Sequence, residues 1–251
     1  MLENKETDWW KAYFSDEWQR IFRYAKNETI TADEADLVSY LLNNISAKTV
    51  LDAPAGEGRI ALELAAQGFQ MTGLEYNQNA VDVSKRLAKK ANLGINFLQG
   101  DMRNMAFEQT FDAAICIFNS FGYFSETDNE RYIASVSQAL KKGGTFILEG
   151  HTLETLLPVF KSKDYWEFED YTILEKRVFN YKTSRLESNW TVLHQEKKTT
   201  YKSSVRIYSY LELTNLMRKY DFHEFEAVDI LGHNFEFGDD NMVLMAKKKR
   251  Q

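Results

Sequence analysis

Hydrophobic residues recur with two alternating periods between residues 31 and 150. Short apolar runs, typical of buried strands, alternate with segments in which apolar residues recur every three or four positions, as on one face of a helix. The strands are predicted at 48–52, 69–75, 95–98, 111–118 and 145–149. Helices are predicted at 59–67 and 79–93. Two more are predicted to start at Thr31 and Thr127, each followed three positions later by a Glu in the capping-box pattern, with the second ending at 141–144.

The period changes to two after residue 160. Trp190, Val192 and His194 alternate with other side chains, and residues 201–207 do the same, so these runs predict antiparallel strands. A helix at 211–220 and strands at 222–231 and 242–247 follow. The chain is therefore predicted to be an α/β protein with a doubly wound, mostly parallel, seven-stranded sheet and an antiparallel β insertion over residues 160–208.

The ends of the first two predicted strands carry chemistry typical of a ligand site. Asp52 ends the first strand, and Gly56 and Gly58 follow in a turn that leads into a helix. Glycines allow positive φ and a close approach of the backbone to a ligand, whereas the carboxylate would repel a phosphate and suits a cation. Glu75 ends the second strand 19 residues after Gly56, near the offset at which an acid binds ribose hydroxyls in dinucleotide folds.

The next two strand ends continue this pattern. Asp101 and Met102 follow the third strand, and the polar and aromatic loop 118–123 follows the fourth. Because parallel strands present their carboxyl ends at one edge of the sheet, these residues are predicted to form one small-molecule site.

At these residues the sequence resembles class I S-adenosylmethionine-dependent methyltransferases, which have a Rossmann-like fold. The matching segments are 51–59, 73–76, 99–102, 111–114, 119–124 and 140–144. Segments 185–191 and 204–209 resemble the strands of a β insertion found in a bacterial subgroup of small-molecule enzymes. The chain departs from the family in Ala55, where Cys is common, and in Glu57, where a small polar or aromatic residue is usual.

The resemblance implies S-adenosyl-L-methionine as cofactor and a role for each matching residue. Asp52, Ala53, Gly56 and Gly58 would surround the methionine part, and Glu75 would accept both ribose hydroxyls. Tyr76 and Phe118 would pack on the two faces of the adenine, while Asp101 and Met102 would bind its polar edge. Residues 1–30 would form a helical lid in which Tyr13 and Trp18 cover the site, although an amphipathic helix packed on the sheet also fits this aromatic stripe. The cofactor-binding core would then comprise 31–159 and 209–251, with 160–208 covering the substrate site.

Methyl transfer is an in-line displacement in which the protein mainly aligns the reacting atoms. A base is needed only where the nucleophile arrives protonated. The candidates for catalysis are Tyr123, Glu149 and His151, with His194 as a further possibility; Glu149 could instead bind a substrate amine, and His151 could be structural. The expected acceptor is an N or O atom of a small molecule.

Composition and charge limit the partners and the cell compartment that we expect for this protein. The 251 residues carry a net charge of −6, which gives no basic field for nucleic acid or an anionic membrane. A single cysteine, Cys116, fits a reducing compartment, and the acidic N-terminus with Glu3, Glu6 and Asp8 does not resemble a signal peptide. A cytoplasmic monomer or homodimer that binds neither metal, membrane nor nucleic acid is therefore expected.

Two other functions fit the same predicted fold. A nicotinamide-dependent oxidoreductase would need a third glycine where the chain has Leu62, and a cofactor-binding interaction module would bind without turnover. About half of the Phe, Tyr and Trp residues fall in 1–24 and 160–210, outside the predicted core. This distribution predicts an aromatic acceptor pocket formed by those two segments.

Overall fold

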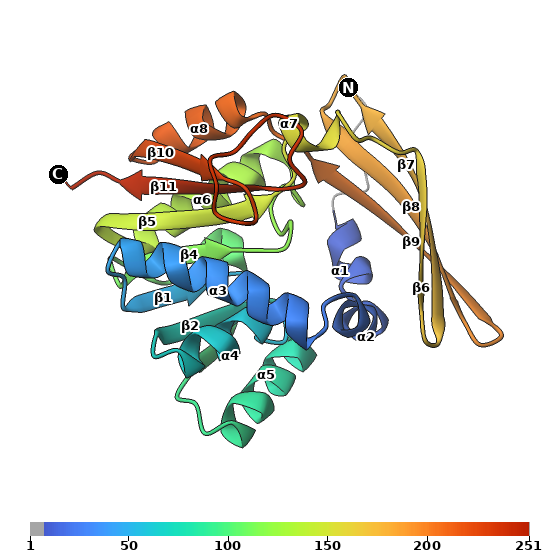
Figure 1. Ribbon diagram of the computed structural model, residues 1–251, viewed down its shortest axis with the longest axis horizontal. Coiled ribbons are helices and arrows are strands. Elements are labelled where there is room, and N and C mark those ends of the chain that lie inside the picture. Colours follow the sequence, from blue (N-terminus) through green and yellow to red (C-terminus); the bar gives the residue numbers. More distant parts are fainter. Residues whose placement is uncertain (1–7, 251) are drawn as a thin grey trace.

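The computed structural model describes residues 8–250 and centres on a seven-stranded sheet of order β10-β11-β5-β4-β1-β2-β3 (Figure 1). Pairing is parallel except where β11 lies antiparallel between β10 and β5. The predicted doubly wound, mostly parallel sheet is therefore confirmed. Its strands are β1 (Thr49–Asp52), β2 (Gln70–Glu75), β3 (Asn96–Gln99), β4 (Phe111–Cys116), β5 (Leu140–Gly150), β10 (Phe222–Val228) and β11 (Met242–Lys248).

Helices cover both faces of this sheet, which explains why its central strands are apolar on both sides. Val50 of β1 packs in a cluster with α3 (Glu28–Asn44), α4 (Arg59–Ala66) and α5 (Gln78–Lys90). The next residue, Leu51, packs in the opposite cluster, which includes side chains of α6 (Glu126–Ala139) and α8 (Tyr210–Arg218). A short 3₁₀ turn, η1 (Met102–Asn104), follows β3, and α7 (Leu153–Leu156) follows β5.

The predicted starts of two helices were wrong by a few residues. Asn27 caps α3 by accepting a hydrogen bond from the backbone of Ile30 at 3.0 Å, so Thr31 lies inside the helix. Ser125 caps α6 in the same way, so Thr127 is also inside. In both cases an earlier polar side chain with an extended backbone reaches the free N–H groups.

Three predicted ends were also wrong. The helix expected to reach 141–144 stops at Ala139, and Leu140 already belongs to β5. β4 ends at Cys116 because Phe118 and Asn119 have φ values of +64° and +53°, which leave the strand conformation. β10 ends at Val228 rather than at residue 231.

A second, antiparallel sheet is inserted between β5 and β10, as predicted. Its order is β6-β7-β8-β9, and it stands beside the carboxyl edge of the main sheet (Figure 1). Directly paired residues share a face, and one face carries a row of Asp164, Glu175, Trp190 and Tyr201. The strands are β6 (Lys163–Phe168), β7 (Tyr171–Asn180), β8 (Arg185–His194) and β9 (Lys197–Arg206).

Two N-terminal helices, α1 (Trp9–Tyr13) and α2 (Asp16–Ala25), lie between the two sheets (Figure 1). The amide of Asn77 in the main domain donates to the carbonyl of Phe14 at 3.0 Å, while the Tyr201 hydroxyl of β9 donates to Glu17 of α2. The helices are thus tied to both sheets. Residues 1–7 of the predicted lid, with Glu3 and Glu6, lie outside the described residues.

Candidate active site

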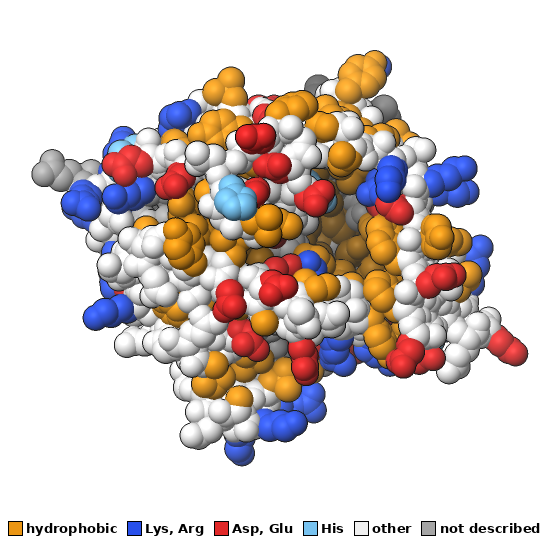
Figure 2. Space-filling view, viewed as in Figure 1, with side chains coloured by type: hydrophobic (Ala, Val, Ile, Leu, Met, Phe, Trp, Pro, Cys, Tyr) orange, Lys and Arg blue, Asp and Glu red, His pale blue; other side chains and the backbone are white. Residues whose placement is uncertain are grey.

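A single cavity of about 1400 Å³ runs from the carboxyl ends of the main-sheet strands to the inner face of the second sheet. Figure 2 shows this hollow with largely hydrophobic walls. Most of the predicted site residues line it, although they come from distant parts of the chain. These are Tyr13, Trp18, Asp52, Gly56, Glu75, Tyr76, Asp101, Met102, Phe118, Tyr123 and His151.

Asp52 places a buried carboxylate at the floor of the cavity. Its side chain is 4% exposed, and no hydrogen bond to its carboxylate is found among residues 8–250. Burial raises its pKa from 3.8 to about 8, and the guanidinium of Arg59 opposes that rise only in part. A ligand ammonium at this position would be stabilised by the carboxylate and would in turn favour its charged form.

Glu75 lies beside Asp52 at the end of the neighbouring strand and is held by backbone amides. Its Oε2 accepts the N–H of Gly56 at 2.9 Å, and its Oε1 accepts the N–H of Asn77 at 2.8 Å. Burial raises its pKa, which these two N–H groups counteract. Each oxygen keeps a further lone pair, so the carboxylate can accept one hydrogen bond from each hydroxyl of a vicinal diol.

The two glycines of the loop after β1 have different roles. Gly56 has φ of +54° and open space where a Cβ would stand, so its backbone borders the cavity. Gly58 has φ of +82°, and a Cβ there would lie 2.5 Å from the Phe97 ring. Gly58 does not line the cavity, so the prediction that it contacts the cofactor is not supported by its place: its missing side chain lets the start of α4 lie against the Phe97 ring.

Ala53 also lies outside the cavity lining, contrary to its predicted position around the methionine part. It is 1% exposed, and its carbonyl accepts the Tyr132 hydroxyl at 2.6 Å. This bond fixes the start of the loop.

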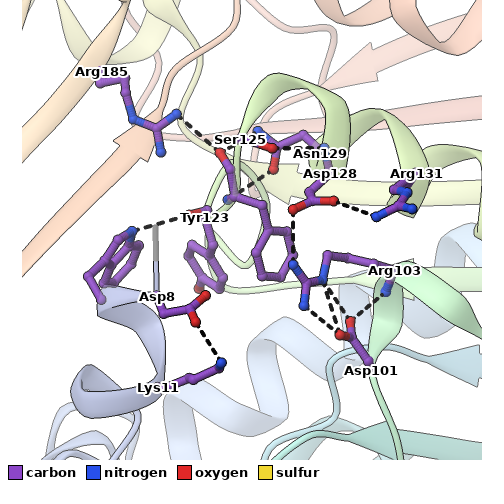
Figure 3. Close-up of polar contacts among 12 residues, drawn as sticks. Asp8, Lys11, Asp101, Arg103, Tyr123, Ser125, Asp128, Asn129, Arg131 and Arg185 are labelled. Carbon is purple, nitrogen blue, oxygen red and sulfur yellow. Dashed lines mark hydrogen bonds and ion pairs between the residues drawn. The ribbon is translucent and has the colours of Figure 1, made fainter. Parts of the chain in front are cut away.

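The loop after β3 holds a charged pair that sequence reasoning missed (Figure 3). Arg103 Nη2 lies 2.6 Å from Asp101 Oδ2, and the Arg103 backbone donates to Asp101 Oδ1 at 2.9 Å. Arg103 also reaches Asp128 at 3.1 Å. These contacts lower the pKa of Asp101 despite its partial burial, so its carboxylate is charged but already engaged. An amino group bound by Asp101 would share it with Arg103.

Trp10 is a second residue that the sequence did not assign to the site. Its ring is 5% exposed and meets Tyr76 edge-on at a centroid distance of 4.8 Å, and the Arg103 guanidinium lies 5.4 Å from the ring centroid. The Trp10 Nε1 donor is buried and has no hydrogen-bond partner in the described part of the chain. It lines the cavity, so an acceptor atom of a ligand could satisfy it.

Glu149 was predicted as a catalytic or amine-binding residue, but it does not line the large cavity. Its Oε2 accepts the backbone N–H of Phe118 and, at 3.4 Å, that of Asn119. Its Oε1 accepts the side-chain amide of Asn241. These bonds hold the left-handed turn after β4, so Glu149 positions that loop.

His151 and Tyr123 both line the cavity, but the pKa of His151 is lowered whereas that of Tyr123 is raised. His151 follows β5 and is solvent-accessible, yet the atoms packed around its ring lower its pKa, so the imidazole is neutral near pH 7. Burial raises the pKa of Tyr123 far above neutrality, so its hydroxyl stays protonated and serves as a hydrogen-bond group rather than a base. His194 lies away from the cavity and stacks on Tyr171 at 4.3 Å.

Aromatic side chains close the cavity opposite the strand ends. Tyr13 stacks on Trp18 with ring centroids 4.5 Å apart, and Trp18 packs edge-on against Trp190 at 5.3 Å. Trp190 in turn stacks on Trp166 at 5.9 Å. Aromatic rings of the N-terminal segment and of the insertion thus meet in the structure, and the prediction that they form the acceptor pocket stays a prediction. Over residues 8–250 there is no cluster of His, Cys, Asp and Glu able to hold a metal ion, and no helix long and apolar enough to cross a membrane.

Part of the chain resembles known methyltransferases in sequence. Residues 50–144 match the family model described as a methyltransferase domain. Glycine/sarcosine N-methyltransferase of Parasynechococcus marenigrum is 30% identical over 148 residues, which are 57% of this chain and 51% of that protein. Ubiquinone biosynthesis O-methyltransferase of Rickettsia akari is 32% identical over 81 residues, or 32% of each chain. The chain thus spans about half or less of the length of these curated relatives.

Solved structures resemble the whole described fold. A S-adenosylmethionine-dependent methyltransferase from Clostridium acetobutylicum superposes with a TM-score of 0.81 at 15% identity, covering 93% of this chain and 98% of that one. The SAM-bound amino pentose methyltransferase CalS10 of Micromonospora echinaspora gives 0.72 at 19% identity, covering 94% and 98%. These likenesses agree with the resemblance drawn from the sequence: residues 50–144 match a methyltransferase-domain model, and the chain has the fold of S-adenosylmethionine-dependent methyltransferases.

Proposed function

We propose that this protein transfers a methyl group from S-adenosyl-L-methionine to an N or O atom of a small-molecule acceptor. One observation carries the proposal: a single cavity joins Asp52 and Glu75, at the strand ends, to the aromatic face of the second sheet. Such a cavity offers adjoining places for a cofactor and an acceptor. The named relatives, which include N- and O-methyltransferases, support the same reaction class, and none supports a nicotinamide enzyme or a non-catalytic module.

The residues at the strand ends fit this cofactor. The Asp52 carboxylate, which accepts no hydrogen bond from residues 8–250, would hold the ammonium of the methionine part, and Glu75 would accept the ribose hydroxyls. Trp10 and Tyr76 meet edge-on and would form a corner against which the adenine lies, with Trp10 Nε1, unpartnered among residues 8–250, as a donor to it. When bound, the cofactor supplies an electrophilic methyl group on a sulfonium.

The remaining residues orient the acceptor and manage its proton. Holding the two reactants in line can contribute about 7–11 kcal/mol to lowering the barrier. The neutral imidazole of His151 can take a proton from an acceptor that arrives protonated, whereas the Tyr123 hydroxyl can hold it by a hydrogen bond.

The contacts of the N-terminal helices support the proposed roles of the domains. Residues 1–30 act as the lid, 31–159 and 209–251 as the cofactor-binding core, and 160–208 as the cover of the acceptor site. Arg23 of α2 forms a two-bond ion pair with Glu57 in the loop after β1, and Phe22 packs on Phe118 at 5.6 Å. Closure of this lid excludes water from the reacting groups.

Calorimetric titration with S-adenosylmethionine, S-adenosylhomocysteine and NADH tests the proposal directly. Binding of the first two with Kd in the micromolar range, and no binding of NADH, is the expected result. Failure of both sulfur compounds to bind would refute it. Added RNA or lipid vesicles should not bind, and sedimentation should give a monomer or homodimer.

Truncation of the lid aromatic Trp18 should weaken binding of S-adenosylhomocysteine about tenfold. Trp18 is 2% exposed and stacks on Tyr13 over the cavity, so Trp18→Ala admits water to the bound ligand. The measurement is calorimetry on Trp18→Ala, with Trp18→Phe as the variant that keeps a ring in place. A lowered melting temperature with unchanged affinity would mean that Trp18 only packs.

A further inference from the structure

The inner face of the second sheet carries a buried carboxylate that has no role in the cofactor site. Glu175 lies in β7, is 3% exposed and lines the large cavity. Its register partners are Asp164 on one side and Trp190 on the other. Charged side chains are rarely buried this deeply unless they are paired, so the partners of Glu175 decide what it can bind.

Within residues 8–250, one of the two Glu175 oxygens is hydrogen-bonded and the other is not. Oε1 accepts the hydroxyl of Ser188 at 2.6 Å, whereas Oε2 has no hydrogen-bond partner and lies 3.3 Å from Nη1 of Arg177. Arg177 is already committed: it donates to the carbonyl of Lys161 at 2.7 Å and pairs with Asp164 at 2.8 Å. One guanidinium therefore faces two carboxylates. Burial raises the pKa of Glu175, and a cation bound in this corner of the cavity would favour its charged form.

The other lysine and arginine side chains that line the cavity come from the N-terminal helices and the main domain; they are Arg23, Lys26, Arg59 and Arg86. Lys26 and Arg59 both pair with Glu34, and Arg23 pairs with Glu57. These pairs belong to α2, α3, α4 and the loop after β1, and Arg86 lies on α5. The charged groups that act on Glu175 are instead Arg177 and Asp164.

Aromatic rings surround the same corner. Trp190 stacks on Trp166 at 5.9 Å, and Tyr13 meets Trp190 at 6.0 Å with planes inclined by 60°. Ring faces attract cations, and the attraction grows when water is excluded. A carboxylate among such rings, with one oxygen that accepts no hydrogen bond from the described residues, is complementary to a desolvated ammonium and repels an anion.

We infer that Glu175, Trp166 and Trp190 bind the ammonium group of the methyl acceptor, which is therefore a small aliphatic amine. This inference rests on the proposed function only in taking the bound amine to be the methyl acceptor. The presence of a cation site on the second sheet is inferred from the contacts of Glu175, Trp166 and Trp190 alone. The Ser188 hydroxyl fixes the carboxylate, and the ammonium supplies the hydrogen bond that Oε2 lacks.

The test uses simple probes of matched shape on the full chain. n-Butylammonium and tetramethylammonium chloride are titrated against n-butanol and sodium butyrate at constant ionic strength, with tryptophan fluorescence and calorimetry as readouts. Both cations are expected to bind, and the neutral and anionic probes at least tenfold more weakly. Equal affinity for n-butylammonium and n-butanol would overturn the inference.

Two variants locate the site. Glu175→Gln keeps the size and the Ser188 contact but loses the charge, so cation affinity should fall about tenfold while S-adenosylhomocysteine affinity stays the same. Trp166→Leu keeps the charge and should lower cation affinity several-fold. Unchanged cation affinity in either folded variant would contradict the assignment, and the second variant decides the matter where the first does not fold.

Glu187→Gln is the matched control. Glu187 lies on β8, and its carboxylate also accepts a serine hydroxyl, that of Ser204 at 2.9 Å, but it is on the opposite face of the sheet. Its replacement should leave cation binding unchanged. Because cofactor binding is measured separately, S-adenosylhomocysteine binding without amine binding refutes this inference alone, and amine binding without S-adenosylhomocysteine binding refutes the proposed function.

Discussion

Replacing Asp52 by Asn should stabilise the ligand-free protein at pH 9 by up to about 5 kcal/mol. The carboxylate is 4% exposed and has no hydrogen bond among the described residues, and its pKa rises from 3.8 to about 8. Ionising it in the folded protein therefore costs free energy that ionising it in the unfolded chain does not. Asn removes the charge at nearly the same volume. Urea unfolding of both proteins at pH 9 and pH 4 measures the difference.

The difference in stability between the protein and Asp52→Asn should depend on pH. Between the unfolded pKa near 4 and the folded value of about 8, the folded protein holds a proton on Asp52 that the unfolded chain has lost. The contribution of Asp52 to stability therefore falls as the pH rises through this range and is constant above it. The two proteins should be similar in stability at pH 4 and diverge towards pH 8. A difference that is the same at both ends would contradict the assignment.

Asp112, at the opposite end of the neighbouring strand, is the matched control. It accepts the backbone N–H groups of Lys48 and Thr49 at 3.0 and 2.9 Å and pairs with Lys141 at 2.8 Å, so its pKa is lowered. Its contribution to stability is present above the unfolded pKa and is lost as the pH falls through the folded one. Asp112→Asn should therefore destabilise the protein at pH 7, the reverse of Asp52→Asn.

The same carboxylate should make cofactor binding depend on pH. Asp52 must lose its proton to pair with an ammonium, so below pH 8 binding releases a proton and affinity rises with pH, approaching tenfold per pH unit between pH 6 and 8. In Asp52→Asn this slope should vanish and the affinity at pH 8 should be lower than in the unchanged protein. Calorimetry with S-adenosylhomocysteine in buffers of different ionisation enthalpy would show both the slope and the released proton.

Part of the site could be predicted from the sequence because the arrangement of parallel strands is regular. Parallel strands bring their carboxyl ends to one edge, so residues that directly follow a buried apolar run, such as Asp52, Glu75 and Asp101, were expected together and do line one cavity. Strand positions were predictable for the same reason, because burial on both faces forces continuous apolar runs. Helix starts were less predictable, since Asn27 and Thr31 are both good caps and only the backbone geometry chooses between them.

The residues that were missed depend on contacts between distant segments. Trp10 reaches the cavity only because α1 lies against Tyr76, and Glu175 only because one face of the second sheet turns towards the main sheet. A period of two predicts that alternate residues share a face but not which face is buried. Glu149 differs from its predicted place because its carboxylate is engaged by a turn that the sequence pattern does not show. The left-handed turn at Phe118 directs backbone N–H groups onto that carboxylate.

Replacing Glu75 by Gln should weaken S-adenosylmethionine binding by about 100-fold or more, the largest loss of affinity expected at this site. In the free protein the carboxylate accepts the N–H groups of Gly56 and Asn77 while its remaining lone pairs face the cavity. Hydrogen bonds to a charged group contribute about 1.5–3 kcal/mol each, so losing the charge under two ligand hydroxyls gives this order of effect. Gln also presents an NH₂ group towards a backbone N–H, which displaces the Gly56 loop or leaves a donor unpaired.

Glu63→Gln provides the control for this change, because Glu63 also lines the cavity but is exposed on α4. Its replacement should change the affinity by no more than about twofold, since exposed charges are screened by solvent. Calorimetry with both variants at pH 9, where Asp52 is ionised, isolates the contribution of Glu75. If Glu75→Gln folded normally and bound S-adenosylmethionine as tightly as Glu63→Gln, the cofactor would not lie at the end of β2, and the site would have to be placed elsewhere in the cavity.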